Sequence, residues 1–139
     1  MFSTHSNNKA KLKTLHSIKC VTVGGKSDKQ AIMHAYKLGR SLNDSDYIPY
    51  VFDDYHFPVA VEGKIYKMAI WDTCDEGAYE NLRVLSYPET NVFLIFFSVT
   101  DRQSFNKVTQ VWIPEIKQHC PDAPCILVAT SIDVRNNTR

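Results

Sequence analysis

A continuous apolar run at residues 92–97, Val-Phe-Leu-Ile-Phe-Phe, constrains the fold more than any other feature of the sequence. A strand with apolar side chains on both faces must be covered on both faces, which is typical of a parallel sheet. Residues 125–129, Cys-Ile-Leu-Val-Ala, form a second such run. Because parallel strands need crossover connections, usually helices, the sequence predicts an α/β domain with helices on both sides of the sheet.

The segments around these runs alternate between strand and helix patterns. Residues 18–23 alternate and are β-branched before Gly24-Gly25, which predicts a strand that runs into a loop. Apolar residues recur at helical spacing over residues 28–38 and 101–119, and Pro114 should bend or break the second helix. The other predicted elements are a polar loop over residues 41–55, a hairpin of residues 57–61 and 65–71, and a loop with a short helix over residues 72–88.

Length and charge exclude several classes of protein. A chain of 139 residues with 44% apolar residues predicts one folded domain, here residues 18–139 after a flexible polar arm at residues 1–17. A net charge of +1 gives no broad basic field for nucleic acid. The four cysteines show no zinc-ligand spacing, and no apolar run is long enough for a signal peptide or a membrane span. We therefore expect a cytoplasmic protein, peripheral at a membrane only through partners.

Four stretches of the sequence form a recognisable series. They are Ile18-Lys19-Cys20-Val21, Tyr47-Ile48-Pro49-Tyr50-Val51-Phe52-Asp53, Trp71-Asp72-Thr73, and the run from Leu85-Ser86-Tyr87-Pro88 to His119-Cys120-Pro121. In this order they resemble the Rho/Rac small GTPases of the Ras superfamily, and the resemblance extends from residue 18 to about residue 135. It implies a three-layer P-loop NTPase-type G domain with a mostly parallel sheet and one antiparallel edge strand, lacking the last strand and helix.

The resemblance places a phosphate-binding loop at residues 24–30, where the sequence departs from the pattern G-x-x-x-x-G-K-[ST]. In a working loop the backbone N–H groups wrap the phosphates, the lysine neutralises them and the hydroxyl holds magnesium. With one residue deleted, Lys29 is the phosphate lysine and Gln30 replaces the hydroxyl. Without a deletion, Gln30 takes the lysine position and Ala31 the hydroxyl position. The magnesium hydroxyl is missing in both alignments.

In the first alignment Asp28 replaces the second glycine of the loop. Its carboxylate would then approach the phosphates, where a like-charge contact at about 4 Å costs on the order of 4 kcal/mol near a protein surface. Alternatively, Asp28 turns outward as the N-cap of the following helix.

The other nucleotide-contacting positions also depart from the family pattern. Tyr50 stands where the family uses a threonine for magnesium, whereas Asp72 is retained and could hold the metal through water. Asp75 replaces the glycine that senses the last phosphate, and Glu76 replaces the glutamine that orients the attacking water, so no catalytic residue is assigned. Both acids could instead be solvated loop charges. The resemblance implies a degenerate nucleotide-binding set of Gly24, Gly25, Lys29, Gln30, Thr130 and Asp133.

The positions that contact protein partners in this family match its pattern better than the nucleotide-contacting positions do. Trp71 stands where Rac-like members present a tryptophan to exchange factors, although packing against a helix is the alternative for it and for its apolar neighbours. The resemblance therefore implies Rho-type exchange factors or effectors as partners. The matching positions are Val51, Phe52, Asp53 and Tyr55 in the effector loop, Trp71, and Tyr79, Leu82, Arg83 and Leu85 in the second switch.

Two functional hypotheses remain. In the first, the protein is a pseudo-GTPase that has no cofactor and acts by binding partners. In the second, it is a divergent GTP-binding switch with slow hydrolysis that binds GTP or GDP with magnesium through Lys29, Asp72 and Asp133. The missing final helix should also leave an apolar sheet face, to be covered by the arm, by a partner or by a second copy in a homodimer through that face or edge, unless the chain is a fragment. No lipid anchor and no nucleic acid are expected.

Overall fold

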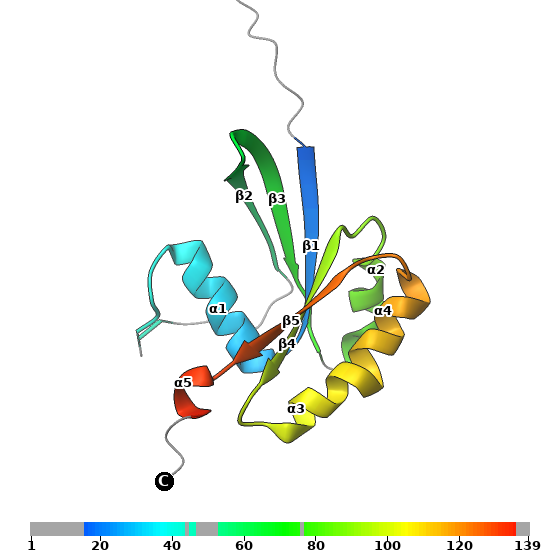
Figure 1. The fold of residues 1–139 in the computed structure, drawn as a ribbon. Coiled ribbons are helices and arrows are strands. Elements are labelled where there is room, and N and C mark those ends of the chain that lie inside the picture. The colour runs from blue at the N-terminus through cyan, green and yellow to red at the C-terminus, as the bar shows by residue number, and fades with distance from the viewer. Residues whose placement is uncertain (1–15, 44, 47–52, 76, 136–139) are drawn as a thin grey trace, which may run out of the picture.

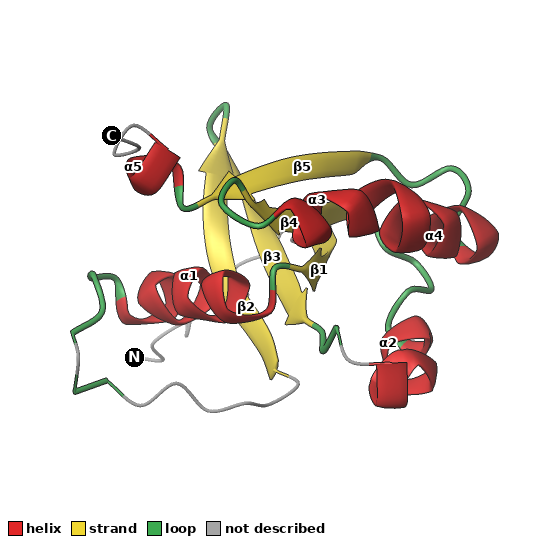
Figure 2. Ribbon diagram, turned by 90° about the horizontal axis from the view of Figure 1, so that it is seen from below, coloured by secondary structure: helices red, strands yellow, loops and turns green. Residues whose placement is uncertain are grey.

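The computed structural model describes residues 16–43, 45–46, 53–75 and 77–135, and these residues form a five-stranded sheet with helices on both sides (Figures 1 and 2). The strand order is β2-β3-β1-β4-β5, and every neighbouring pair is parallel except β2 with β3. This arrangement confirms the predicted α/β class with one antiparallel edge strand. The strands are β1 (His16–Gly24), β2 (Asp53–Val61), β3 (Lys64–Asp72), β4 (Val92–Ser98) and β5 (Cys125–Thr130).

Helix α1 lies on one face of the sheet, and α3 and α4 lie on the other (Figure 1). Because β1, β3, β4 and β5 are parallel, their carboxyl ends lie at one edge of the sheet, where a ligand crevice is expected. The helical segments are α1 (Lys26–Leu38), η1 (Gly77–Tyr79), α2 (Glu80–Leu85), α3 (Arg102–Lys107), η2 (Val108–Trp112), α4 (Ile113–His119) and α5 (Ile132–Arg135).

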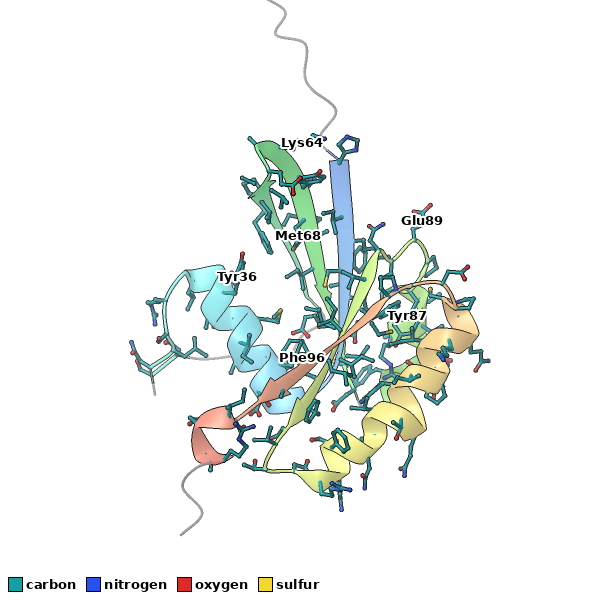
Figure 3. All side chains as sticks on the ribbon, viewed as in Figure 1. Tyr36, Lys64, Met68, Tyr87, Glu89 and Phe96 are labelled. Carbon is teal, nitrogen blue, oxygen red and sulfur yellow. The ribbon has the colours of Figure 1, made fainter. Side chains whose placement is uncertain are left out.

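The two-residue period of the strands divides the core into two layers. Val21 and Val23 of β1 pack with Phe93 and Ile95 of β4 against the α4 side, where Tyr87 is also buried. Residues of opposite parity face α1 and form a smaller cluster of Cys20, Met33, Ile70 and Phe96. Figure 3 shows Tyr87 on the α4 side and Phe96 on the side of α1. The predicted double-sided burial of the central strands is thus confirmed, although β5 is an edge strand whose Ile126 and Leu127 are about half exposed.

Two strand boundaries differ from the sequence prediction. β1 begins at His16, because residues 16 and 17 continue the parallel ladder with Tyr66 and Lys67. β2 begins at Asp53 rather than after Tyr55, because residues 53–55 pair with residues 70–72 of β3. Backbone pairing along a long partner strand therefore outweighs the polar composition that predicted an arm and a loop.

The predicted break at Pro114 is replaced by a π-helical turn. Val108–Trp112 is π-helical between α3 and α4, and the N–H of Ile113 donates to the carbonyl of Val108 five residues earlier. A proline in α-helical register lacks one N–H and collides with the carbonyl four residues before it. The wider π turn removes that collision, so the helix runs on to His119.

We predict that Gly24→Ala destabilises the fold far more than Gly63→Ala. Both glycines have a positive φ, 75° and 74°, but a Cβ on Gly24 would lie 2.5 Å from the carbonyl oxygen of Phe96, whereas nothing lies within 4 Å of one on Gly63. Gly63→Ala should cost about 1 kcal/mol from the backbone conformation alone, and Gly24→Ala at least about 3 kcal/mol. Denaturant unfolding measures both, and equal losses would contradict the close approach of β1 to β4.

Candidate functional site

The carboxyl end of β1 turns into α1 through a single residue, Gly25. Gly24 and Gly25 both have positive φ, and a Cβ on Gly25 would lie 2.7 Å from the Cβ of Phe96. The N–H of Lys29 already donates to the carbonyl of Gly25, so the helix starts at Lys26, two residues earlier than predicted. A loop that wraps phosphates needs several non-helical residues between its glycines. Here the helix takes up that stretch.

Lys29 lies in the first turn of α1, and its side chain is buried, with 1% of the residue's surface exposed. Its Nζ lies 2.9 Å from Oδ1 of Asp72 at the end of β3, and it also donates to the carbonyl of Thr73. The Oγ1 of Thr22 donates to the same Asp72 oxygen over 3.1 Å, and the Oγ1 of Thr73 donates to the carbonyl of Thr22 over 2.7 Å. We call Lys29, Asp72, Thr22 and Thr73 the buried lysine network. It joins α1, β1 and β3 at their meeting point.

Asp28 does not take the predicted N-cap role, and it makes two hydrogen bonds that neither alternative predicted. Gly25 is the N-cap of α1 and makes no side-chain cap. The Oδ2 of Asp28 instead accepts hydrogen bonds from Oγ1 of Thr130 over 2.6 Å and from Oγ of Ser131 over 2.8 Å. Asp28 therefore ties α1 to the end of β5, where the resemblance placed the base-recognition residues.

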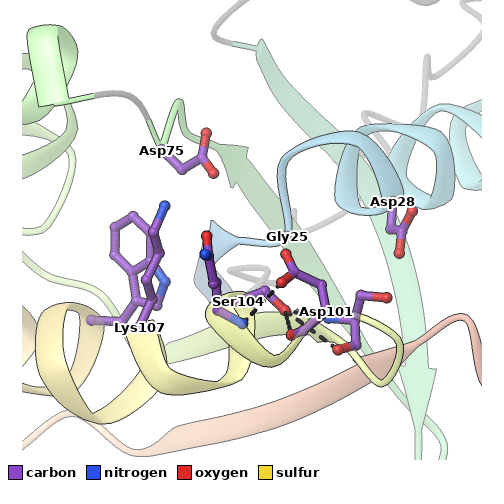
Figure 4. Close-up of a pocket in the computed structure, with 9 residues that line it drawn as sticks. Gly25, Asp28, Asp75, Asp101, Ser104 and Lys107 are labelled. Carbon is purple, nitrogen blue, oxygen red and sulfur yellow. Dashed lines mark hydrogen bonds between the residues drawn. The ribbon is translucent and has the colours of Figure 1, made fainter.

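A cavity of about 180 Å³ opens at the carboxyl ends of the strands, beside Gly25. Figure 4 shows Asp28, Asp75 and Asp101 around it, with Lys107 as the one basic side chain among the residues that line it. Three carboxylates against one ammonium group make the cavity unfavourable for an anion. The lining residues are Gly25, Asp28, Asp75, Ser98, Asp101, Gln103, Ser104, Lys107 and Trp112.

The structure does not bring the predicted nucleotide residues together in this cavity. Gly25 alone of that set lines it. Gln30 is half-buried on α1, and Asp133 is exposed on the short helix α5. Thr130 is buried and bonded to Asp28. The position of Glu76 lies outside the described residues, as does that of Tyr50.

Two charged residues that line the cavity were not predicted from the sequence: Asp101, at the start of α3, and Lys107, at its end. Asp101 is the N-cap of α3, and its Oδ1 accepts from the N–H of Gln103 over 2.9 Å. The position of Asp101 in the sequence could have indicated its role. It follows a buried strand by a few residues, and such residues lie at the carboxyl edge of a parallel sheet.

The predicted partner-facing residues fall into three groups. Tyr79, Leu82 and Leu85 on η1 and α2 are exposed, Leu85 at 75%. Trp71 is half-buried, packs against the core, and has the Nζ of Lys19 4.6 Å from the centre of its ring. The effector-loop positions Val51 and Phe52 lie outside the described residues, and only the backbone of Asp53 and Tyr55 in β2 is described.

The prediction that the Arg83 side chain faces a partner is wrong, because this side chain is buried within the protein. It is 2% exposed, and its guanidinium donates to both carboxylate oxygens of Glu115 on α4, over 2.9 and 2.7 Å. It also donates to the carbonyl of Cys74 over 2.9 Å and lies 5.0 Å from the centre of the Trp112 ring. Burial and the hydrogen bond to Glu115 raise the pKa of Tyr87, which donates to the same carboxylate over 2.5 Å. Arg83 is therefore a structural cation.

A model of the Ras family matches residues 19–139. The chain belongs to the Ras family. This membership agrees with the sheet order, the single antiparallel pair and the glycine turn after β1. Among the described residues of this Ras family chain, no helix has the length and apolar character to cross a bilayer, and no three His, Cys, Asp or Glu side chains gather as a metal site.

Ras family proteins generally bind GTP or GDP with magnesium, and the residues described here do not fit that group. The phosphate lysine candidate is paired with the carboxylate that would serve the metal. The strand-to-helix turn holds one residue, and Asp28 bonds the edge where a base would be recognised.

We predict that breaking the buried ion pair from one side destabilises the protein strongly. Lys29→Met leaves Asp72 buried without its cation, and Asp72→Leu leaves Lys29 buried without its carboxylate, so each should cost about 3 to 5 kcal/mol. The double variant should lose markedly less than the sum of the two, because neither charge is then unpaired. Urea unfolding of the three variants measures this coupling, and strict additivity would show that the two side chains do not interact.

Proposed function

We propose that this Ras family member is a Rho-like pseudo-GTPase, an interaction module that engages or sequesters exchange factors or effectors without nucleotide. The observation that carries the proposal is the buried contact of 2.9 Å between Lys29 and Asp72. In this family's chemistry a lysine and a carboxylate at these positions serve the phosphates and the magnesium ion. Here each neutralises the other.

Nucleotide binding would have to break this contact. Lys29 would leave a carboxylate that is 5% exposed and a carbonyl that it also bonds. Among the described side chains, Asp72 would keep the hydroxyl of Thr22. Removing one partner of a buried ion pair costs about 3 to 5 kcal/mol. A cost of that size lowers affinity by roughly two to four orders of magnitude.

The negative charge of the cavity also lowers the expected affinity for a nucleotide. Asp28, Asp75 and Asp101 face the space where phosphates would enter. Each like-charge contact at about 4 Å costs on the order of 4 kcal/mol at the effective dielectric constant of a protein surface. The three carboxylates also disfavour the negative charge that develops during in-line hydrolysis.

The side of the protein that could meet partners keeps exposed apolar residues. Leu82 and Leu85 are 54% and 75% exposed on α2, and Tyr79 precedes them on η1 at 41%. Exposed apolar and aromatic side chains that lie close together are typical interface anchors. We assign this surface, with Trp71 at its border, to Rho-type exchange factors or effectors, and we place the protein in the cytoplasm, at membranes only through such partners.

Membership of the Ras family favours a second candidate, a divergent GTP-binding switch with slow hydrolysis. In that case Lys29 would exchange Asp72 for the phosphates, and Asp133 would recognise guanine. The two candidates make opposite predictions about nucleotide affinity.

We predict that calorimetric titration with GTP and with GDP, each with magnesium, gives no binding up to about 1 mM. Thermal melting should be equally unaffected, since a ligand that binds the folded state must stabilise it. Asp28→Gly is a matched variant that removes one cavity carboxylate and leaves Lys29 and Asp72 in place. A dissociation constant in the micromolar range for the unmodified chain would establish the switch instead.

We predict that Leu82→Ala/Leu85→Ala abolishes capture of a purified Rho-type exchange-factor catalytic domain while the melting temperature changes by no more than a few degrees. Both side chains are largely exposed, so little burial is lost within the chain. Leu38→Ala is the control, because Leu38 is an exposed leucine of α1 on the other face of the sheet. Unchanged capture by the double variant would remove α2 from the interface.

A further inference from the structure

Helix α2 depends on contacts with the rest of the protein for its stability and position. It contains six residues, Glu80–Leu85, and a helix this short is marginal in water without tertiary contacts. Four of the six are exposed, Val84 is half-buried, and Arg83 is its one buried side chain. In Figures 1 and 2, α2 lies on the side of the sheet that carries α3 and α4. The contacts of Arg83, together with the packing of Val84 against the core, therefore hold α2 in place.

Those contacts form a closed polar cluster between three segments. Arg83 on α2 donates twice to Glu115 on α4 and once to the carbonyl of Cys74, just after β3. Tyr87 donates to the same Glu115 carboxylate. Burial by itself would raise the pKa of Glu115, but the hydrogen bonds from Arg83 and Tyr87 outweigh it and lower that pKa. We call Arg83, Glu115 and Tyr87 the clamp.

The clamp is built from the kinds of bond that specify geometry. Two parallel N–H···O bonds from a guanidinium to a carboxylate fix both the distance and the relative orientation of the two groups. The ring of Trp112 beneath the guanidinium limits its position from another direction. The bonds of Arg83 and Tyr87 to Glu115 involve no residue of the turn after β1, whereas Trp112 also lines the cavity beside that turn.

We propose that Glu115 is the positioning residue for α2: through the clamp it holds Tyr79, Leu82 and Leu85 in one arrangement that a partner can bind without any nucleotide signal. The consequence for partner binding rests on the proposed function, whereas the clamp itself acts in the free chain. The proposal makes the partner surface constitutive, because the contacts that set it are internal to the protein.

The experiment compares amide hydrogen exchange of the free full chain with that of Glu115→Gln, which keeps the size of the side chain and removes its charge. Exchange at residues 80–86 should accelerate by about tenfold or more, because the local opening free energy falls. Exchange in α1 and in β1 should stay as it was. Glu89→Gln is the matched control, since Glu89 is an exposed glutamate in the connection after α2, and it should leave α2 unchanged.

A second readout follows the clamp directly. The chain has two tryptophans, so a Trp71→Phe background isolates the fluorescence of Trp112, which lies 5.0 Å from the Arg83 guanidinium. Glu115→Gln should change this emission, and Glu89→Gln should not. If Glu115→Gln fails to fold, Tyr87→Phe takes its place, with a smaller acceleration expected because it removes one of the hydrogen bonds to the carboxylate.

Unchanged exchange in α2 would overturn the proposal, because the clamp would then have no effect on the position of α2. An equal acceleration of all protected amides would also overturn it, because the clamp would then stabilise the whole core and not α2 in particular. Neither result depends on nucleotide or partner. Conversely, nucleotide binding in the calorimetric titration would overturn the proposed function and leave the exchange result standing, so the two failures can be told apart.

Discussion

The buried contact between Lys29 and Asp72 is the constraint from which the arrangement of the site follows. A lysine that is 1% exposed needs a partner for its charge, and the end of β3 supplies a carboxylate and a carbonyl. This requirement brings α1 down onto the carboxyl ends of β1 and β3, which the single-residue turn at Gly25 permits. With the helix in that position, a single residue is left between β1 and α1, too few to form a loop that wraps a phosphate.

A second buried cation acts on the same stretch of chain from the opposite side. Lys29 holds Asp72 and the carbonyl of Thr73, and Arg83 holds the carbonyl of Cys74. The last residue of β3 and the two residues after it are thus fixed by side chains from α1 and α2. A ligand shifts a conformational equilibrium only by its differential affinity for two states. A segment whose bonds are satisfied within the protein offers a nucleotide little to change. Under the proposed function, both cations therefore favour a single state of the partner surface.

The sequence predicted the sheet better than the site, and the reasons are physical. The apolar runs at β4 and β5 and the glycines after β1 act locally, so their pattern indicates strands and a turn without knowledge of the rest of the fold. The hydrogen bonds of Asp28 join residues more than 100 positions apart, from α1 to Thr130 and Ser131. Nothing in the local sequence around Asp28 or around Arg83 distinguishes a solvated charge from a buried one. The burial of Arg83 depends on Glu115, which is 32 residues away.

The buried pairs should be understood as determinants of geometry more than as sources of stability. A buried ion pair gains little over apolar residues of similar volume, because desolvation offsets most of the attraction, but its loss from one side is expensive. A protein that binds a ligand tightly also gains folding free energy from it. A chain that works without nucleotide gives up that gain and must hold the same backbone with its own side chains. Under the proposed function, the lysine network and the clamp meet this need where phosphate and metal contacts would otherwise organise the fold, and the exposed residues of α2 bind the partner.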